Sequence, residues 1–209
     1  MLRGLALAAA VAALAASAVA AAPRTSAAGC TKVARPAPKP NGGYKKPMIK
    51  LLRRKHYDVT FTTNCGSFTI RLAVGISPHT TASFFTLAKT GFFDHTFFHR
   101  IIPGFVIQGG DPTGTGTGGP GYSVVDRPPP TTVYRKYLAA MAKTQFDPSG
   151  TAGSQFFVDT ADVQLPPEYA VLGTVFVGRK IVDRIGRLGT RSGKPTQIVE
   201  ILRTRVSIR

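Results

Sequence analysis

The residues best suited to chemistry lie in one short segment, residues 97–111, which reads FFHRIIPGFVIQGGD. A lone arginine, Arg100, is followed after the Pro103-Gly104 corner by an aromatic residue, Phe105, and an amide, Gln108. The alternating apolar positions on both sides of the corner predict two short strands joined by a turn. Alternation would bring Arg100, Phe105 and Gln108 toward one surface. A cation, an apolar ring and an amide suit binding a peptide and acting on a peptide bond, and none of the three is a nucleophile.

This segment resembles the signature of the cyclophilin family of peptidyl-prolyl cis/trans isomerases, here as a bacterial, exported member. Three further stretches match in order: AMAKT at residues 140–144, GSQFFV at 153–158 and YAVLG at 169–173. They are similar to the strand that lines the family's active site, to its second signature and to its (H/Y)-x-V-F-G segment, with Leu172 in place of the usual phenylalanine. The resemblance runs, with gaps, from about His56 to the C-terminus.

Many short strand-like runs with two helical stretches predict a mainly β domain, a barrel or a sandwich. The runs 57–63 and 67–74 flank a turn and predict a hairpin, and further strands are predicted around 138–142, 154–158, 171–175 and 197–202. Residues 80–90 and 180–188 have helical periodicity. The resemblance selects between the two architectures and implies a closed eight-stranded antiparallel barrel with a helix at each open end.

Isomerisation of an X-Pro bond needs no covalent step, but rotation faces a barrier of about 18–20 kcal/mol from amide resonance. A catalyst must bind the twisted amide, whose nitrogen is pyramidal and more basic, better than either planar isomer. A fixed guanidinium can do so by donating to the proline nitrogen or the neighbouring carbonyl. The resemblance assigns this role to Arg100, the arginine that follows histidine in FHR.

The resemblance also implies an apolar pocket for the proline ring, two glutamines that orient the arginine or hold the substrate, and a strand whose main chain binds an extended peptide. The pocket residues would be Phe105, Val106, Phe157, Leu165 and a capping Tyr169, the glutamines Gln108 and Gln155, and the strand residues Ala142 and Lys143. Arg100, Phe105 and Gln108 are expected to act in catalysis and the others to bind substrate. No cofactor and no metal are implied.

Three positions depart from the family pattern. Gln164 stands where many eukaryotic members have a tryptophan that helps bind cyclosporin, and Lys143 replaces an asparagine in the same groove. Tyr169 occupies a position often held by histidine, but a tyrosine can still cap the pocket. We therefore expect catalysis to persist and cyclosporin binding to be weakened.

Other apparent motifs are weaker. His95 and His99 have the spacing of helical metal ligands, but the segment is predicted as strand, which favours a packed or surface pair. The loop 114–121 is rich in glycine but lacks the Gly-Lys-Ser/Thr ending of a phosphate loop, so we interpret it as a loop that keeps the groove open. Ser154 has no hydrolase motif around it, and Asp111 is predicted to cap the turn after Gly109-Gly110.

The N-terminus is typical of a secretory signal. Arg3 supplies a short basic region, and an uncharged, alanine-rich run follows from Leu5 to Ala22. Residues 1–22 are therefore predicted as a cleaved signal peptide, and the protein as exported, either secreted or attached to the cell surface. The alternative is an uncleaved anchor, because the run is almost long enough to span a bilayer.

The chain has two cysteines, Cys30 and Cys65, and an even number in an exported chain suggests a disulfide. Cys65 lies in a turn signal, so a bridge would staple the N-terminal tail to the hairpin and stabilise the fold by about 3–4 kcal/mol. One alternative is a pair of free thiols. The other is a lipid anchor at Cys30, against which Pro23-Arg24 argues by interrupting the apolar run.

The formal net charge is +17, and the excess is concentrated. Residues 31–55 contain nine Lys or Arg and no acid, and residues 179–209 contain nine against Asp183 and Glu200. Because no nucleic-acid-binding motif accompanies this charge, we expect no specific nucleic acid partner and favour electrostatic contact with anionic cell-surface polymers or lipids. Residues 23–55, rich in Pro, Gly and Lys, are predicted as an extended basic linker, and residues 56–209 as the isomerase domain.

Two hypotheses compete with an isomerase that acts on exported proteins. One is a non-catalytic module that binds proline-containing or extended peptides. The other is a basic, wall-associated protein in which the barrel is only a scaffold. A pure binder has no need of Arg100, Phe105 and Gln108 together, which favours the enzyme.

Overall fold

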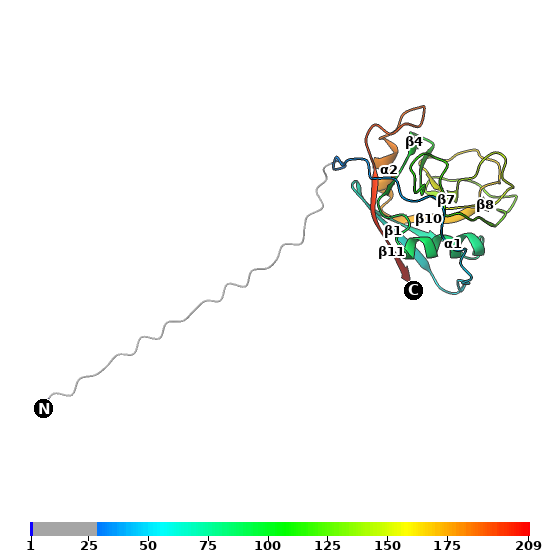
Figure 1. Cartoon of the computed structure of the whole chain (residues 1–209), viewed down its shortest axis with the longest axis horizontal. Helices are drawn as coiled ribbons and strands as arrows, with labels where there is room; N and C mark the ends of the chain where they lie inside the picture. The colour runs from blue at the N-terminus through cyan, green and yellow to red at the C-terminus, as the bar shows by residue number, and fades with distance from the viewer. Residues whose placement is uncertain (2–28) are drawn as a thin grey trace.

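The computed structural model describes Met1 and residues 29–209 (Figure 1). The predicted signal peptide, apart from Met1, and the first part of the predicted linker lie outside the described residues. No helix within the described part of the chain has the length and apolar character needed to cross a membrane.

The described residues form short strands and two helices, in the mainly β pattern that the sequence predicts. The strands are β1 (Tyr57–Thr63), β2 (Gly66–Leu72), β3 (Thr96–Phe97), β4 (Arg100–Ile102), β5 (Val106–Gly109), β6 (Val124–Val125), β7 (Leu138–Met141), β8 (Thr151–Ala152), β9 (Phe156–Asp159), β10 (Val171–Val177) and β11 (Glu200–Ile208). The helices are α1 (Pro78–Lys89) and α2 (Arg179–Gly186). α1 packs against β11 and β1, and α2 packs against β2, β4 and β5.

One curled antiparallel sheet of nine strands carries the fold, in the order β3-β11-β1-β2-β10-β7-β9-β5-β4, and β6 pairs separately with β8. The predicted mainly β fold class with two helices is confirmed, although the word closed slightly overstates the curling of this nine-stranded sheet. The two end strands, β3 and β4, follow each other in the chain. The amide of Phe98, just after β3, donates to the carbonyl of Val199, and the amide of Ile101 in β4 donates to the carbonyl of Gly193. The segment before β11 therefore lies along the junction of β3 and β4.

The core that supports the site is largely aromatic. Phe61 of β1 stacks on Phe68 of β2 with ring centroids 5.1 Å apart, and Phe84 of α1 lies 4.7 Å from Phe93. Phe156 of β9 packs edge-on against Phe84, at 5.2 Å. All five side chains are fully buried, so the strands that carry the site rest on a rigid support.

The predicted disulfide is confirmed: Cys30 is bonded to Cys65 in the turn between β1 and β2. The described part of the predicted linker, residues 29–55, contains no helix or strand, but its first half lies along the domain. We call residues 30–44 the strap. The disulfide, hydrogen bonds and the contact of the Tyr44 ring with Phe92 hold the strap, and none of these produces a periodic hydropathy pattern.

Candidate active site

The hairpin of β4 and β5 presents the predicted site residues on one face. Arg100 pairs with Gln108 and Ile101 with Ile107 in the ladder. Both isoleucines are fully buried in the core, so the partly buried Arg100 and Gln108 lie on the opposite face. The turn at Pro103-Gly104 is closed by a hydrogen bond from the amide of Phe105 to the carbonyl of Ile102. The strand pair and turn that the sequence predicts are confirmed.

A pocket of about 160 Å³ lies against this hairpin. It is bounded by β4, β5, the end of β7, β9 and the segment before β10. Its lining residues are Arg100, Phe105, Val106, Gln108, Ala142, Lys143, Phe157, Leu165 and Tyr169. Nine of the ten predicted site residues therefore meet in one place, and the tenth, Gln155, lies beside it. Because the resemblance assigns these residues to the binding of a proline ring, we call this cavity the proline pocket.

A chain of hydrogen bonds fixes Arg100 at the edge of the pocket. Its Nη1 donates to Oε1 of Gln108 at 3.1 Å, and Nε2 of Gln108 donates to Oε1 of Gln155 at 3.2 Å. Nε2 of Gln155 in turn donates to the carbonyls of Gly116 and Gly118. The guanidinium also lies 5.7 Å from the centroid of the Phe105 ring. Its orientation is thus set by neutral groups, and among the described residues no carboxylate forms an ion pair with it.

Two residues that sequence reasoning missed support the walls of the pocket. The hydroxyl of Tyr134 donates to the carbonyl of Tyr169 at 2.9 Å and accepts from its amide at 3.0 Å. Burial raises the pKa of Tyr134 to about 12, so this hydroxyl keeps its proton. Glu168 forms an ion pair with Nζ of Lys143 at 3.1 Å. Lys143 was expected to offer main-chain groups, but its side chain is also nearly buried and extends over the Tyr169 ring.

Burial and hydrogen bonding lower the pKa values of two titratable residues of this region, His99 and Asp111. Burial lowers the pKa of His99, so its imidazole is neutral beside the guanidinium. Burial alone would raise the pKa of Asp111, but hydrogen bonds from Thr113 and from the amides of Gly116 and Gly118 lower it overall. Asp111 therefore organises the glycine-rich loop, as its predicted role in the turn requires. No group of three metal-ligating side chains occurs among the described residues.

A second pocket, of about 410 Å³, adjoins the first and shares Gln108, Ala142 and Lys143 with it. Its walls are the glycine-rich loop 116–121, the loop that contains Thr144 and Asp147, residues 153–155, and Asn41 from the strap. Because the two cavities share these lining residues, we describe them together as one groove. Nothing in the sequence pattern pointed to Asn41, because it lies in the predicted linker.

The fold and the site define a class: a β protein in which an apolar cavity lies beside a guanidinium held by a neutral hydrogen-bond acceptor. The comparison with protein families agrees, since the model of the family "Cyclophilin type peptidyl-prolyl cis-trans isomerase/CLD" matches residues 58–206. The chain therefore belongs to the cyclophilin family of peptidyl-prolyl cis/trans isomerases, as its motifs predict.

Curated relatives and solved structures support this assignment. The chain is 39% identical to peptidyl-prolyl cis-trans isomerase B of Streptomyces anulatus, over 68% of this chain and 91% of the relative. It is 38% identical to peptidyl-prolyl cis-trans isomerase-like 1 of Emericella nidulans, over 71% and 94% respectively. A cyclophilin-type isomerase of Cryptosporidium parvum, solved in the presence of the dipeptide Ala-Pro, superposes with a TM-score of 0.67 at 33% identity, covering 72% of this chain and 98% of that chain.

Proposed function

We propose that this isomerase is a bacterial enzyme that acts on exported proteins, and that Arg100 accelerates X-Pro rotation by stabilising the twisted amide. The observation that carries the proposal is the state of Arg100. Its guanidinium is held by Gln108, has no carboxylate partner among the described residues, and borders the apolar proline pocket. A charge-assisted donor in that position has free N–H groups to offer a substrate.

In the proposed mechanism the proline ring enters the pocket between Phe105, Phe157 and Leu165. Arg100 then donates to the proline nitrogen or to the adjacent carbonyl as the amide loses its planarity. The hydrogen-bonded glutamines keep the guanidinium in place, so little reorganisation accompanies the rotation. No bond is made or broken and no proton is transferred. The Cryptosporidium relative crystallised with Ala-Pro supports a proline-containing ligand for this groove.

The proposed destination outside the cytoplasm is supported by two features. The N-terminal residues have the composition of a secretory signal, and a disulfide persists in oxidising compartments. A Cys30 sulfur that is bonded to Cys65 has no thiol to accept a lipid, so a soluble or electrostatically attached protein fits better than a lipoprotein. The basic residues of 31–55 would supply contact with anionic polymers or lipids.

The proposed partners are therefore proline-containing polypeptides, with no specific nucleic acid. We also propose weak binding of cyclosporin, because Gln164 is an exposed amide where many family members offer a tryptophan ring.

A protease-coupled assay of a model X-Pro peptide tests the mechanism. We expect catalysed isomerisation by the full chain and a fall in kcat/KM of about 100-fold or more for Arg100→Ala, the loss typical of removing one preorganised donor. Circular dichroism would verify that the variant is folded. A folded Arg100→Ala variant with unchanged turnover would remove Arg100 from the mechanism, and peptide binding without acceleration by the wild type would favour the non-catalytic binding module.

A further inference from the structure

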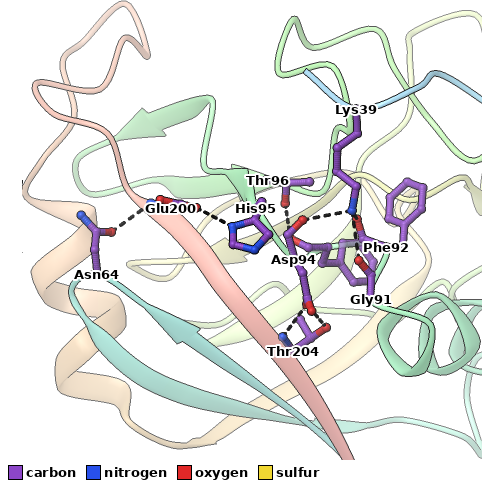
Figure 2. A network of polar contacts seen from close by, with 10 residues as sticks. Lys39, Asn64, Gly91, Phe92, Asp94, His95, Thr96, Glu200 and Thr204 are labelled. Atoms are coloured by element: carbon purple, nitrogen blue, oxygen red, sulfur yellow. Dashed lines mark hydrogen bonds and ion pairs between the residues drawn. The ribbon is translucent and has the colours of Figure 1, made fainter. Parts of the chain in front are cut away.

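The strap is fastened to the domain at both ends. Near Cys30, the amide of Thr31 donates to the carbonyl of Asn64 at 2.9 Å, and Nδ2 of Asn64 donates to the carbonyl of Thr31 at 2.6 Å. Further along, Nζ of Lys39 donates to the carbonyls of Gly91, Phe92 and Asp94 at 2.7–3.0 Å (Figure 2). These three bonds use every proton of the ammonium group, so the Lys39 side chain fastens the strap to the turn after α1.

The turn that receives Lys39 is itself tied to the sheet. Oδ1 of Asp94 accepts from the amide of Thr204 at 2.7 Å and from its hydroxyl at 2.8 Å. On the other side of Figure 2, His95 contacts Glu200, whose amide donates to Oδ1 of Asn64 at 2.9 Å. The strap is therefore anchored to two turns that are themselves hydrogen-bonded to β11.

Between Lys39 and Tyr44 the strap runs beside the glycine-rich loop. The amide of Lys39 donates to the carbonyl of Pro112 at 2.8 Å, that of Gly42 to Gly119 at 2.9 Å, and that of Tyr44 to Pro120 at 3.1 Å. The amide of Gly119 returns a bond of 2.9 Å to Oδ1 of Asn41. A Cβ on Gly121 would lie only 3.0 Å from Cα of Gly42, so the two backbones touch.

This loop is part of the site. The carbonyls of Gly116 and Gly118 accept hydrogen bonds from Gln155, which is the last side chain in the series of hydrogen bonds that orients Arg100. Its residues 116–121 also form one wall of the second pocket, and Asn41 lines the same cavity. The strap thus reaches the substrate groove both directly and through the loop.

We propose that the strap is part of the substrate-binding site and that Asn41 is a positioning and specificity-determining residue for the second pocket. By fixing Gly119, Asn41 holds the loop as a wall against which the residues flanking the X-Pro unit bind. The remaining side chains of that pocket are mostly polar, among them Thr117, Ser123, Thr144 and Thr151, so the pocket favours polar flanking residues. The inference rests on the proposed function for its substrate class.

The test compares two peptides with the full chain, its disulfide intact. One is a blocked Ala-Pro peptide that fills only the proline pocket, and the other extends it on both sides with glutamine residues. The variants are Asn41→Ala, Asn41→Asp, which retains the acceptor for Gly119, and Lys46→Ala, which removes an exposed charge just beyond the end of the strap. Isomerisation kinetics and the amide exchange rate of Gly119 are measured for each.

For Asn41→Ala we expect the ratio of kcat/KM for the long peptide to that for the short one to fall about three- to tenfold, the range for one lost hydrogen bond. The fall should appear in KM, with faster exchange of the Gly119 amide. Asn41→Asp should recover most of the ratio, and Lys46→Ala should match the wild type. An unchanged ratio in Asn41→Ala, or an equal loss in Asn41→Asp, would overturn the proposal. If the wild type binds peptides without isomerising them, the proposed function fails, and the ratio of the two dissociation constants, measured by NMR titration, decides the role of Asn41.

Discussion

The two pockets of the groove are built in different ways. One wall of the proline pocket is made from strands, with Arg100 on β4, Val106 and Gln108 on β5 and Phe157 on β9, and its other five lining residues lie in turns and loops. The second pocket is made chiefly from loops and from a segment of the chain that precedes β1. Strands that rest on a packed core hold side chains within narrow limits, whereas loops depend on hydrogen bonds for their shape. The first construction suits a reaction common to all X-Pro substrates, and the second suits selection among them.

The first prediction concerns a buried carboxyl group on β9, the strand that also carries Phe157 of the proline pocket. Asp159 ends β9, is fully buried, and neither carboxyl oxygen has a hydrogen-bond partner among the described residues. Burial, with a contribution from Asp162, raises its pKa to about 8. Between pH 4 and 8 the folded state therefore keeps a proton that the unfolded state has lost, and stability falls as pH rises, by up to about 1.4 kcal/mol per pH unit.

Urea unfolding at pH 5 and pH 8 measures this effect. We expect the difference in unfolding free energy between Asp159→Asn and the wild type to grow from pH 5 to pH 8 in favour of the variant. The comparison with Asp159→Asn cancels other titrating groups such as His99, whose lowered pKa acts in the opposite direction. A difference that is the same at both pH values would show that the carboxyl is not held neutral.

The second prediction concerns the wall of the proline pocket. Phe157→Leu keeps an apolar core residue but removes the ring that packs edge-on against Tyr169 at 5.4 Å. We expect kcat/KM to fall about tenfold, equivalent to about 1.4 kcal/mol, for short and long peptides alike. The matched change in the second pocket, Thr117→Ala, should act on long peptides. An effect of Phe157→Leu confined to long peptides would contradict the assignment of different roles to the two pockets.

The smallest effect on kcat/KM is expected at Gln155, the residue that joins the two pockets. Gln155→Ala removes the link from Gln108 to the carbonyls of Gly116 and Gly118. Because Arg100 keeps its bond to Gln108, we expect a fall in kcat/KM of about fivefold, the size of one or two neutral hydrogen bonds. Kinetics with both peptides would show a larger loss for the long one. A loss of kcat/KM as large as that of Arg100→Ala would mean that the orientation of the guanidinium depends on the full series of hydrogen bonds from Arg100 to the glycine-rich loop.

The features of the fold that the sequence could predict are those set by local patterns, and the features that it could not predict are set by contacts between distant residues. The hairpin of β4 and β5 and both helices were predictable, because local alternation and helical periodicity determine which side chains share a face. The residues of the proline pocket were predicted only through the family resemblance. The exact bonding of the end strands β3 and β4 was not predictable, because it depends on where the amides of Phe98 and Ile101 bond across the chain. Asn41, Tyr134 and the docking of Lys39 were missed for a related reason. Each acts through polar contacts with residues distant in sequence, and such contacts leave no periodic pattern.

The most direct test of the account is NMR exchange spectroscopy on an Ala-Pro peptide with the wild type, Arg100→Ala and Arg100→Lys. It measures binding and the rate of cis/trans exchange in the same sample. We predict that all three bind the peptide, since the apolar pocket is intact, and that only the wild type exchanges it rapidly, because an ammonium lacks the planar fork of the guanidinium. Rapid exchange by folded Arg100→Ala at the wild-type rate would contradict the central claim.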